Sequence, residues 1–145
     1  MIYLDTSFLT PLFRAEPVSQ RVEKLLAVQP PGTLAISHWT RVEFASVMAR
    51  DVRMKILDAT AARRLIEEFD ALADESLHVL IPAAADFDLA LDFVAEFATR
   101  LRGPDALHLA IARNNGIDEI LTLDDDLLFA AKKLKLKARR GVKSS

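Results

Sequence analysis

Four short apolar runs, separated by helical segments, constrain the fold of this chain most strongly. They are Ile2–Leu4, Thr33–Ile36, Leu77–Ile81 and Ile120–Leu123. The first of them ends in acid and is typical of a strand that is buried on both faces. Short apolar strands that alternate with helices predict an α/β layer protein with a parallel sheet. Leu136–Arg139 is a candidate edge strand, so we expect four or five strands.

The segments between the strands have helical spacing and helix-capping residues. Predicted helices are a short one that Thr6 or Ser7 caps and that runs through Phe13, then Val18–Val28, His38–Arg50, a helix capped by Asp58, one around Phe87–Arg102, one from Pro104 to about Asn114, and Leu127–Leu134. Ser37 is a plausible N-cap for the third of these. Residues 106–112 are apolar nearly all round the helix, which predicts that this helix is central in the domain.

The length of 145 residues suits one domain with a substantial core. We expect this domain over residues 1–140, followed by a basic, disordered tail at 141–145. No apolar run is long enough to cross a bilayer, so no membrane partner is expected. The absence of cysteine excludes disulfides, thiolate catalysis and zinc fingers, and fits a cytoplasmic protein.

Charge is distributed unevenly along the chain. Residues 132–145 hold seven of the 19 Lys and Arg residues and no acid, which leaves 12 bases against all 21 acids in the rest. A basic end on an acidic body is a possible polyanion contact. A solvated end that aids solubility is the equally simple alternative.

Two aspartates directly follow predicted strands. Asp5 ends the first strand and precedes the hydroxyls of Thr6 and Ser7, and Asp124 follows the fourth strand. In parallel sheets the working site lies beyond the carboxyl ends of the strands, at a topological switch point. Both aspartates are therefore expected at this edge, although Asp5 could equally be an ordinary turn or helix-cap residue.

Asp105 and Glu43 are the other two candidate site residues. Asp105 follows Pro104 in the first helical turn, where free backbone amides favour an ionised carboxylate. A simple helix-dipole aspartate is the alternative, but a central helix should point its start into the domain. Glu43 lies at the margin of an apolar helix face, and a surface pair with Arg50 is its alternative reading.

The aspartate triplet after the fourth strand needs an assignment of its own. Asp124 is assigned to the site because it is nearest to the strand end, and Asp126 is the reserve candidate. Asp125 is expected to be solvated or to cap the next helix.

Convergence of four carboxylates would require compensating charge. Two unit charges at ~4 Å repel by about 4 kcal/mol at an effective dielectric of 20, so such a cluster either raises its pKa values or recruits cations. Oxygen ligands select Mg²⁺ or Mn²⁺ over zinc, and these ions bind phosphates and activate water. His38, His78 and His108 do not form a metal-binding set. His108 lies one turn beyond Asp105 and could face the site, but a packing role is expected for it.

The motifs together match a known family. The start LDTS, the glutamate in TRVEFASVMAR, PDALHLAIA and LTLDDDLLFAA resemble, in order and spacing, the PIN-domain ribonucleases, and within them the VapC-type toxins of toxin–antitoxin pairs. The resemblance implies a three-layer α/β/α sandwich, a groove that binds Mg²⁺ or Mn²⁺, and cleavage of RNA by a metal-activated water. It also implies a homodimer that is silenced by a cognate antitoxin.

The family roles carry over to individual positions of this chain. The resemblance implies that Asp5, Glu43, Asp105 and Asp124 are the catalytic metal ligands. Asp126 is an additional candidate ligand, and Thr6, Ser7 and Thr122 are candidate contacts to substrate or to the ligands, although Thr6 and Ser7 could instead simply cap the helix. The chain departs from many relatives at Asp125 and Asp126, where those carry arginines. The basic C-terminal end could replace that positive charge.

Two other functions remain open on the sequence alone. A haloacid-dehalogenase-like phosphatase also places acids after parallel strands, but it needs an aspartate two residues after the nucleophile, where this chain has Ser7. A PIN-like domain that only binds RNA or a partner, without turnover, is the other. Intact acids argue against it.

Overall fold

The central sheet of the computed structural model, which describes residues 1–143, has five strands that all run parallel. The strands are β1 Ile2–Leu4, β2 Leu34–Ser37, β3 His78–Leu80, β4 Glu119–Leu121 and β5 Ala138–Arg139, in the order β3-β2-β1-β4-β5. The order reverses at β1, so the gap between the ends of β1 and β4 is the switch point at which sites form. The predicted parallel α/β sheet is confirmed, and the candidate fifth strand is its edge.

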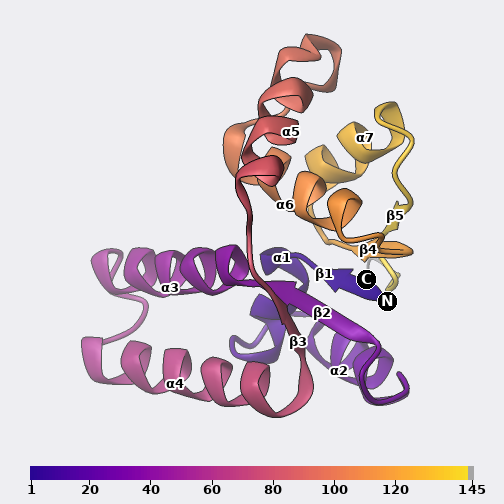
Figure 1. Cartoon of the computed structure of the whole chain (residues 1–145). Coiled ribbons are helices and arrows are strands. Elements are labelled where there is room, and N and C mark those ends of the chain that lie inside the picture. Colours follow the sequence, from indigo (N-terminus) through magenta and orange to yellow (C-terminus); the bar gives the residue numbers. More distant parts are fainter. Residues whose placement is uncertain (144–145) are drawn as a thin grey trace.

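Helices cover both faces of this sheet (Figure 1). They are α1 Thr6–Leu9, α2 Ser19–Ala27, α3 His38–Arg53, α4 Ala59–Ser76, α5 Ala84–Ala95, α6 Gly103–Asn114 and α7 Asp125–Lys133, with 3₁₀ turns η1 Thr10–Leu12 and η2 Phe97–Thr99. Helices α1 to α4 lie on one side, and α5 to α7 on the other. The three-layer α/β/α architecture is therefore as predicted.

The side chains along each strand point alternately to the two faces of the sheet, so a hydrophobic core forms on each face. Tyr3 and Ile120 pack among α5, α6 and α7, whereas their neighbours Leu4 and Leu121 pack among α1 to α4. Successive strand residues point to opposite faces, so a strand covered on both sides is apolar throughout. Residues 106–112 of α6 are all buried, which confirms that α6 is a central helix.

Helix capping follows the sequence at two positions and departs from it at one. Ser37 caps α3 through a capping box with Thr40, and Asp58 caps α4 by accepting from the Ala61 amide. The first helix, however, is capped by Asp5, whose carboxylate accepts from the amide of Phe8. The prediction of Thr6 or Ser7 as this cap is wrong because a carboxylate already stands at the strand end.

Helix α5 ends earlier than predicted, and the apolar residues that were predicted for its buried face are partly exposed. It stops at Ala95, and the η2 turn replaces its predicted last turn before the left-handed residue Arg100. The core side of α5 carries Ala90 and Phe93. The predicted apolar residues Phe87 and Leu91 are instead 54% and 69% exposed.

The C-terminal segment is described only in part. Within the predicted tail 141–145, Val142 packs against the core on the α2 side, and Arg21 donates a hydrogen bond to the carbonyl of Lys143. Ser144 and Ser145 lie outside the described residues. The domain boundary at 140 stays a prediction. No helix within residues 1–143 is long and apolar enough to cross a membrane.

Candidate active site

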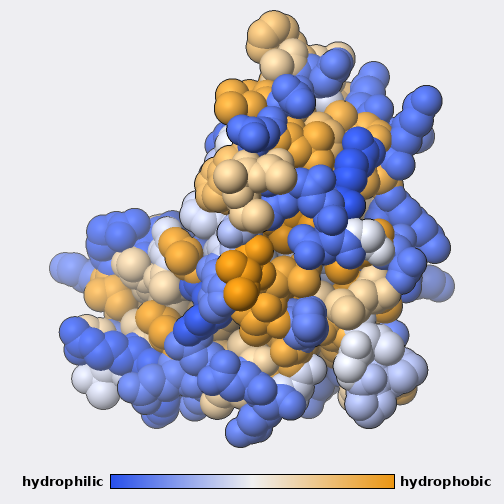
Figure 2. Space-filling view, in the orientation of Figure 1, coloured by the Kyte–Doolittle hydropathy of each residue, from blue (hydrophilic) through white to orange (hydrophobic). Residues whose placement is uncertain are grey.

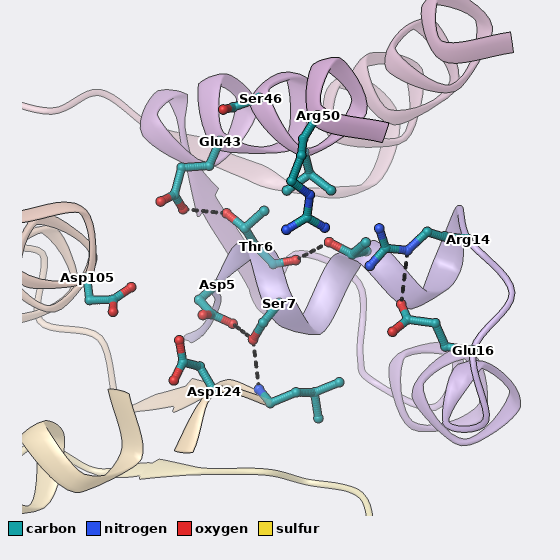
Figure 3. A pocket seen from close by; sticks show the side chains of 13 residues that line it. Asp5, Thr6, Ser7, Arg14, Glu16, Glu43, Ser46, Arg50, Asp105 and Asp124 are labelled. Carbon is teal, nitrogen blue, oxygen red and sulfur yellow. Dashed lines mark hydrogen bonds and ion pairs between the residues drawn. The ribbon is translucent and has the colours of Figure 1, made fainter. Parts of the chain in front are cut away.

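The four predicted acids line one cavity of about 490 Å³ at the carboxyl ends of β1 and β4 (Figure 3). Asp5 comes from the end of β1, Glu43 from α3, Asp105 from the start of α6, and Asp124 from the loop after β4. The structure thus brings together side chains that are up to 119 residues apart in a chain of 145. The reserve candidate Asp126 is exposed and does not line the cavity.

Asp5 is the most buried of the four acids. It is only 4% exposed, and its Oδ1 accepts hydrogen bonds from Ser7 Oγ at 2.7 Å and from the Phe8 amide at 3.2 Å. Burial raises the pKa of Asp5 to about 6, although His108 and these hydrogen bonds favour its charged form. Both of these hydrogen bonds are to Oδ1, and the neighbouring Thr122 hydroxyl also favours the charged form of Asp5.

Asp105 occupies the first turn of α6. The start of this helix is fixed by Trp39, whose Nε1 donates to the carbonyl of Pro104 at 3.2 Å. Burial, then the negative charge of Asp124 and also of Glu43 and Asp5, raises the pKa of Asp105 to about 6. The Asp105 carboxylate points into the cavity (Figure 3).

Glu43 is held by His108, a partner that the sequence alone did not indicate. Glu43 Oε1 accepts from Thr6 Oγ1 at 2.7 Å and is paired with His108 Nε2. The other ring nitrogen of His108 lies 2.7 Å from the Tyr3 hydroxyl. Within the described residues Glu43 forms no ion pair with Arg50, so that alternative is wrong.

The Glu43–His108 pair is charged on both sides. Burial alone would lower the pKa of His108, but its contacts with Tyr3, Glu43 and Asp5 raise it to about 10. Burial works against the charged form of Glu43 too, but His108 and Thr6 hold its pKa below the ordinary value. His108 is 1% exposed, so it is packed as expected, and it also supplies a buried positive charge beside the acids.

One carboxylate oxygen of Asp124 caps a helix, and the other accepts no hydrogen bond within residues 1–143. Its Oδ1 caps α7 by accepting from the amides of Asp126 at 2.8 Å and Leu127 at 3.3 Å. Its carboxylate also points toward Asp5 (Figure 3). Asp125, expected to be solvated or capping, pairs with Nη1 of Arg140.

The three predicted hydroxyls connect these acids to the backbone. Thr122 is fully buried, lies 3.2 Å from Ser7 Oγ, and accepts from the Asp124 amide at 3.0 Å. Ser7 Oγ also accepts from the Leu123 amide at 2.9 Å. Thr6 and Ser7 line the cavity, whereas Thr122 lies behind it. These bonds fix the loop after β4 against the start of α1.

The far half of the cavity contains residues that the sequence did not single out. Arg14, Glu16, Ser46 and Arg50 line it (Figure 3). Nη1 of Arg14 donates to both oxygens of the buried Asp51, at 3.0 and 3.3 Å. No local pattern links Arg14 to Asp51, because the pairing depends on how α3 packs beside η1.

The donor set of the cavity fits a hard divalent cation. The four acids offer only oxygen atoms, as Mg²⁺ and Mn²⁺ prefer. Among residues 1–143, no three acidic, histidine or cysteine side chains are already placed closely enough to hold an ion, so the carboxylates would have to turn toward it. Burial is the largest cause of the raised pKa values of Asp5 and Asp105, and for Asp105 the negative charges of Asp124, Glu43 and Asp5 add to it, a repulsion that a bound cation would relieve.

Comparison with known proteins gives one family and a set of similar folds. The family model described as the PIN domain matches residues 2–133. A comparison with curated protein sequences finds no match.

Solved structures of similar fold cover nearly the whole chain. The VapC20 toxin of Mycobacterium tuberculosis, named as cleaving the sarcin-ricin loop, has 21% identity and a TM-score of 0.72, over 90% of this chain and 95% of that one. A FitAcB structure from Neisseria gonorrhoeae has 17% identity and a TM-score of 0.71, over 97% and 98%. VapBC-1 from nontypeable Haemophilus influenzae has 18% identity and a TM-score of 0.67, over 99% and 100%.

Proposed function

This chain belongs to the PIN-domain family, and we propose that it is a metal-dependent endoribonuclease that acts as the toxin of a toxin–antitoxin pair. The observation that carries the proposal is the convergence of Asp5, Glu43, Asp105 and Asp124 on one cavity. Four carboxylates gathered in one cavity cost stability unless a cation compensates them, which favours a metal-dependent enzyme over a module that only binds RNA.

The four acids would hold one or two Mg²⁺ or Mn²⁺ ions. Such ions, when bound, supply a water that is nucleophilic at neutral pH and offset the charge that develops on a phosphate. The residues of the chain keep the ligands in place: His108 and Thr6 orient Glu43, and Ser7 orients Asp5. These fixed hydrogen bonds reduce the reorganisation that is needed during the reaction.

The partner is proposed to be an antitoxin protein. A solved structure of similar fold, at 21% identity and a TM-score of 0.58 over 86% of this chain and 87% of that one, is named as a toxin–antitoxin complex from Klebsiella pneumoniae. An antitoxin segment that places a basic side chain among the four acids would compete with the metal. The target RNA and the identity of the antitoxin would then be set by surfaces outside the acids.

We also propose that the toxin is a homodimer. The exposed apolar residues of α5, which are Phe87, Leu91 and Val94, support this because isolated monomers seldom leave such a face uncovered. Orange, apolar surface is visible in the upper part of the molecule, where α5 lies (Figure 2).

Cleavage of single-stranded RNA by the purified protein tests the enzymatic proposal. We expect cleavage with Mg²⁺ or Mn²⁺, none with a chelator, and none from Asp105→Asn, while the exposed substitution Asp74→Asn on α4 leaves the rate unchanged. Metal-independent cleavage, or full activity of Asp105→Asn, would refute the mechanism. Tight RNA binding without turnover would instead favour a binding module, and hydrolysis of phosphomonoesters alone a phosphatase.

Expression in bacteria tests the toxin role. Induction of the protein should arrest growth, Asp105→Asn should not, and a small DNA-binding protein encoded next to the gene should restore growth when co-expressed. If the active nuclease leaves growth unaffected, the toxin role is wrong even though the chemistry stands.

A further inference from the structure

The cavity has two ends of different character. The four acids occupy one end, and Arg14, Glu16 and Arg50 lie at the other, beyond Ser46 and Thr6 (Figure 3). Glu43 and Arg50 are seven residues apart on α3, which places them on the same helix face about 10 Å apart along its axis. A strand of nucleic acid that crosses the acids therefore continues toward the arginines.

The two arginines differ in how strongly the protein already binds them. Nη1 of Arg14 donates to both oxygens of Asp51, and its Nε lies 3.8 Å from Glu16 Oε2. Its positive charge is therefore matched by carboxylates on two sides. This arrangement fixes Arg14 as a support for the cavity wall between η1 and α3.

Arg50 remains available for an anion. Its Nη2 lies 3.8 Å from Asp51 Oδ1, beyond hydrogen-bonding distance, and Asp51 is already bonded to Arg14. The Arg50 side chain is 54% exposed, and within residues 1–143 its guanidinium donates no hydrogen bond. Its planar set of five donors matches the oxygen atoms of a phosphate.

We propose that Arg50 binds the RNA phosphate next to the scissile one and so sets the direction in which the strand crosses the acids. The inference rests on the proposed nuclease function and adds a substrate contact to it. Repulsion between RNA and the acidic end makes such a contact necessary, because a strand held only through metal would be free to rotate about the scissile phosphate. Arg50 orients the strand from two helical turns away.

Salt-dependent RNA binding tests this role. In the Asp105→Asn background, which prevents cleavage, Arg50→Ala should weaken the binding of single-stranded RNA about tenfold, as expected for the loss of one charge-assisted contact. The slope of log affinity against log salt should fall by about 0.7, the value for one phosphate contact on a single strand. Arg53→Ala, an exposed arginine on the same helix outside the cavity, should change neither quantity.

Kinetics in the otherwise unmodified protein provide the second measurement. Arg50→Ala should raise KM for RNA with a small change in kcat, Arg50→Lys should recover part of the loss, and circular dichroism should show an intact fold. An unchanged salt slope in Arg50→Ala, with cleavage intact in the parent protein, would overturn the role of Arg50 and leave the nuclease proposal standing. Binding that depends on Arg50 without any cleavage would overturn the nuclease proposal and, with it, the placement of Arg50 beside a scissile phosphate, so that only an RNA contact would be left. Absence of RNA binding by the parent would overturn that contact as well.

Discussion

Glu43 and His108, 65 residues apart in the chain, form a partly buried ion pair between Oε1 and Nε2 at the edge of the acidic cavity. His108 comes from the central helix α6, one turn after Asp105, and Glu43 from α3. The pair therefore joins two helices that lie on opposite sides of the sheet. It also keeps one of the four acids ionised and oriented before any metal binds.

Substitution of either Glu43 or His108 should show how strongly the two side chains stabilise each other. His108→Gln keeps a polar side chain of similar length but removes the positive charge, so we expect the free energy of unfolding to fall by about 2–4 kcal/mol. Urea denaturation checks this value. In Glu43→Gln/His108→Gln the total loss should be smaller than the sum of the single losses, and additive losses would show that the pair is not coupled.

The buried carboxylate of Asp5 should make metal-free protein less stable as pH rises. Its pKa in the folded protein is about 6, above the ordinary value of 3.8, so the folded state holds a proton that the unfolded state has already released between these values. Stability contributed by protonated Asp5 is present below about pH 4 and lost by about pH 6, at a cost of about 3 kcal/mol.

Asp5→Asn isolates this effect from the other acids. Without metal, the variant should gain stability relative to the parent as pH rises from about 4 to about 6, and thermal unfolding measures the difference. Mg²⁺ should stabilise the parent at the upper end of this range and leave the variant unaffected. If the difference in stability between the variant and the parent stays constant across this pH range, burial does not raise the pKa of Asp5.

Two substitutions of Asp124 should separate its helix-capping role from its metal-binding role. Asp124→Asn keeps the oxygen that accepts from the amides of Asp126 and Leu127, so stability should be retained while RNA cleavage is lost. Asp124→Ala should lose cleavage and, in addition, about 1 kcal/mol of stability, because the cap is removed. Asp126→Asn should retain cleavage, and a loss there equal to that of Asp124→Asn would reverse the assignment.

The exposed apolar face of α5 should form the dimer interface. Leu91→Asp places a charge in the middle of the apolar residues, so a dimeric parent should become monomeric in sedimentation velocity. Val28→Asp, at an equally exposed apolar residue after α2, should have no effect. A Leu91→Asp variant that sediments like the parent would rule out this face as the interface.

Much of the fold and the acidic site can be read from the sequence because both depend on local patterns. Each strand end lies within two residues of its predicted position, and Ser37 and Asp58 cap their helices as expected. Parallel strands bring their carboxyl ends to one edge, so Asp5 and Asp124 meet there without any knowledge of side-chain packing.

The sequence alone does not identify residues whose role depends on contacts with distant parts of the chain. Spacing alone pairs Arg50 with Glu43, but the partner of Glu43 in the fold is His108. Asp51 accepts a hydrogen bond from Arg14 at the other end of the cavity. The apolar residues of α5 are equally ambiguous, since the same stripe fits a core and an exposed interface. Helix spacing shows which residues share a face, but not what covers it.

The position of a bound Mn²⁺ ion, located by anomalous scattering from crystals soaked in Mn²⁺, tests the central claim most directly. We expect a peak in the cavity among the carboxylates of Asp5, Glu43, Asp105 and Asp124, which would hold the ion. The peak should be missing in Asp105→Asn. An ion bound elsewhere, or an empty cavity in protein that cleaves RNA with Mn²⁺, would contradict the account.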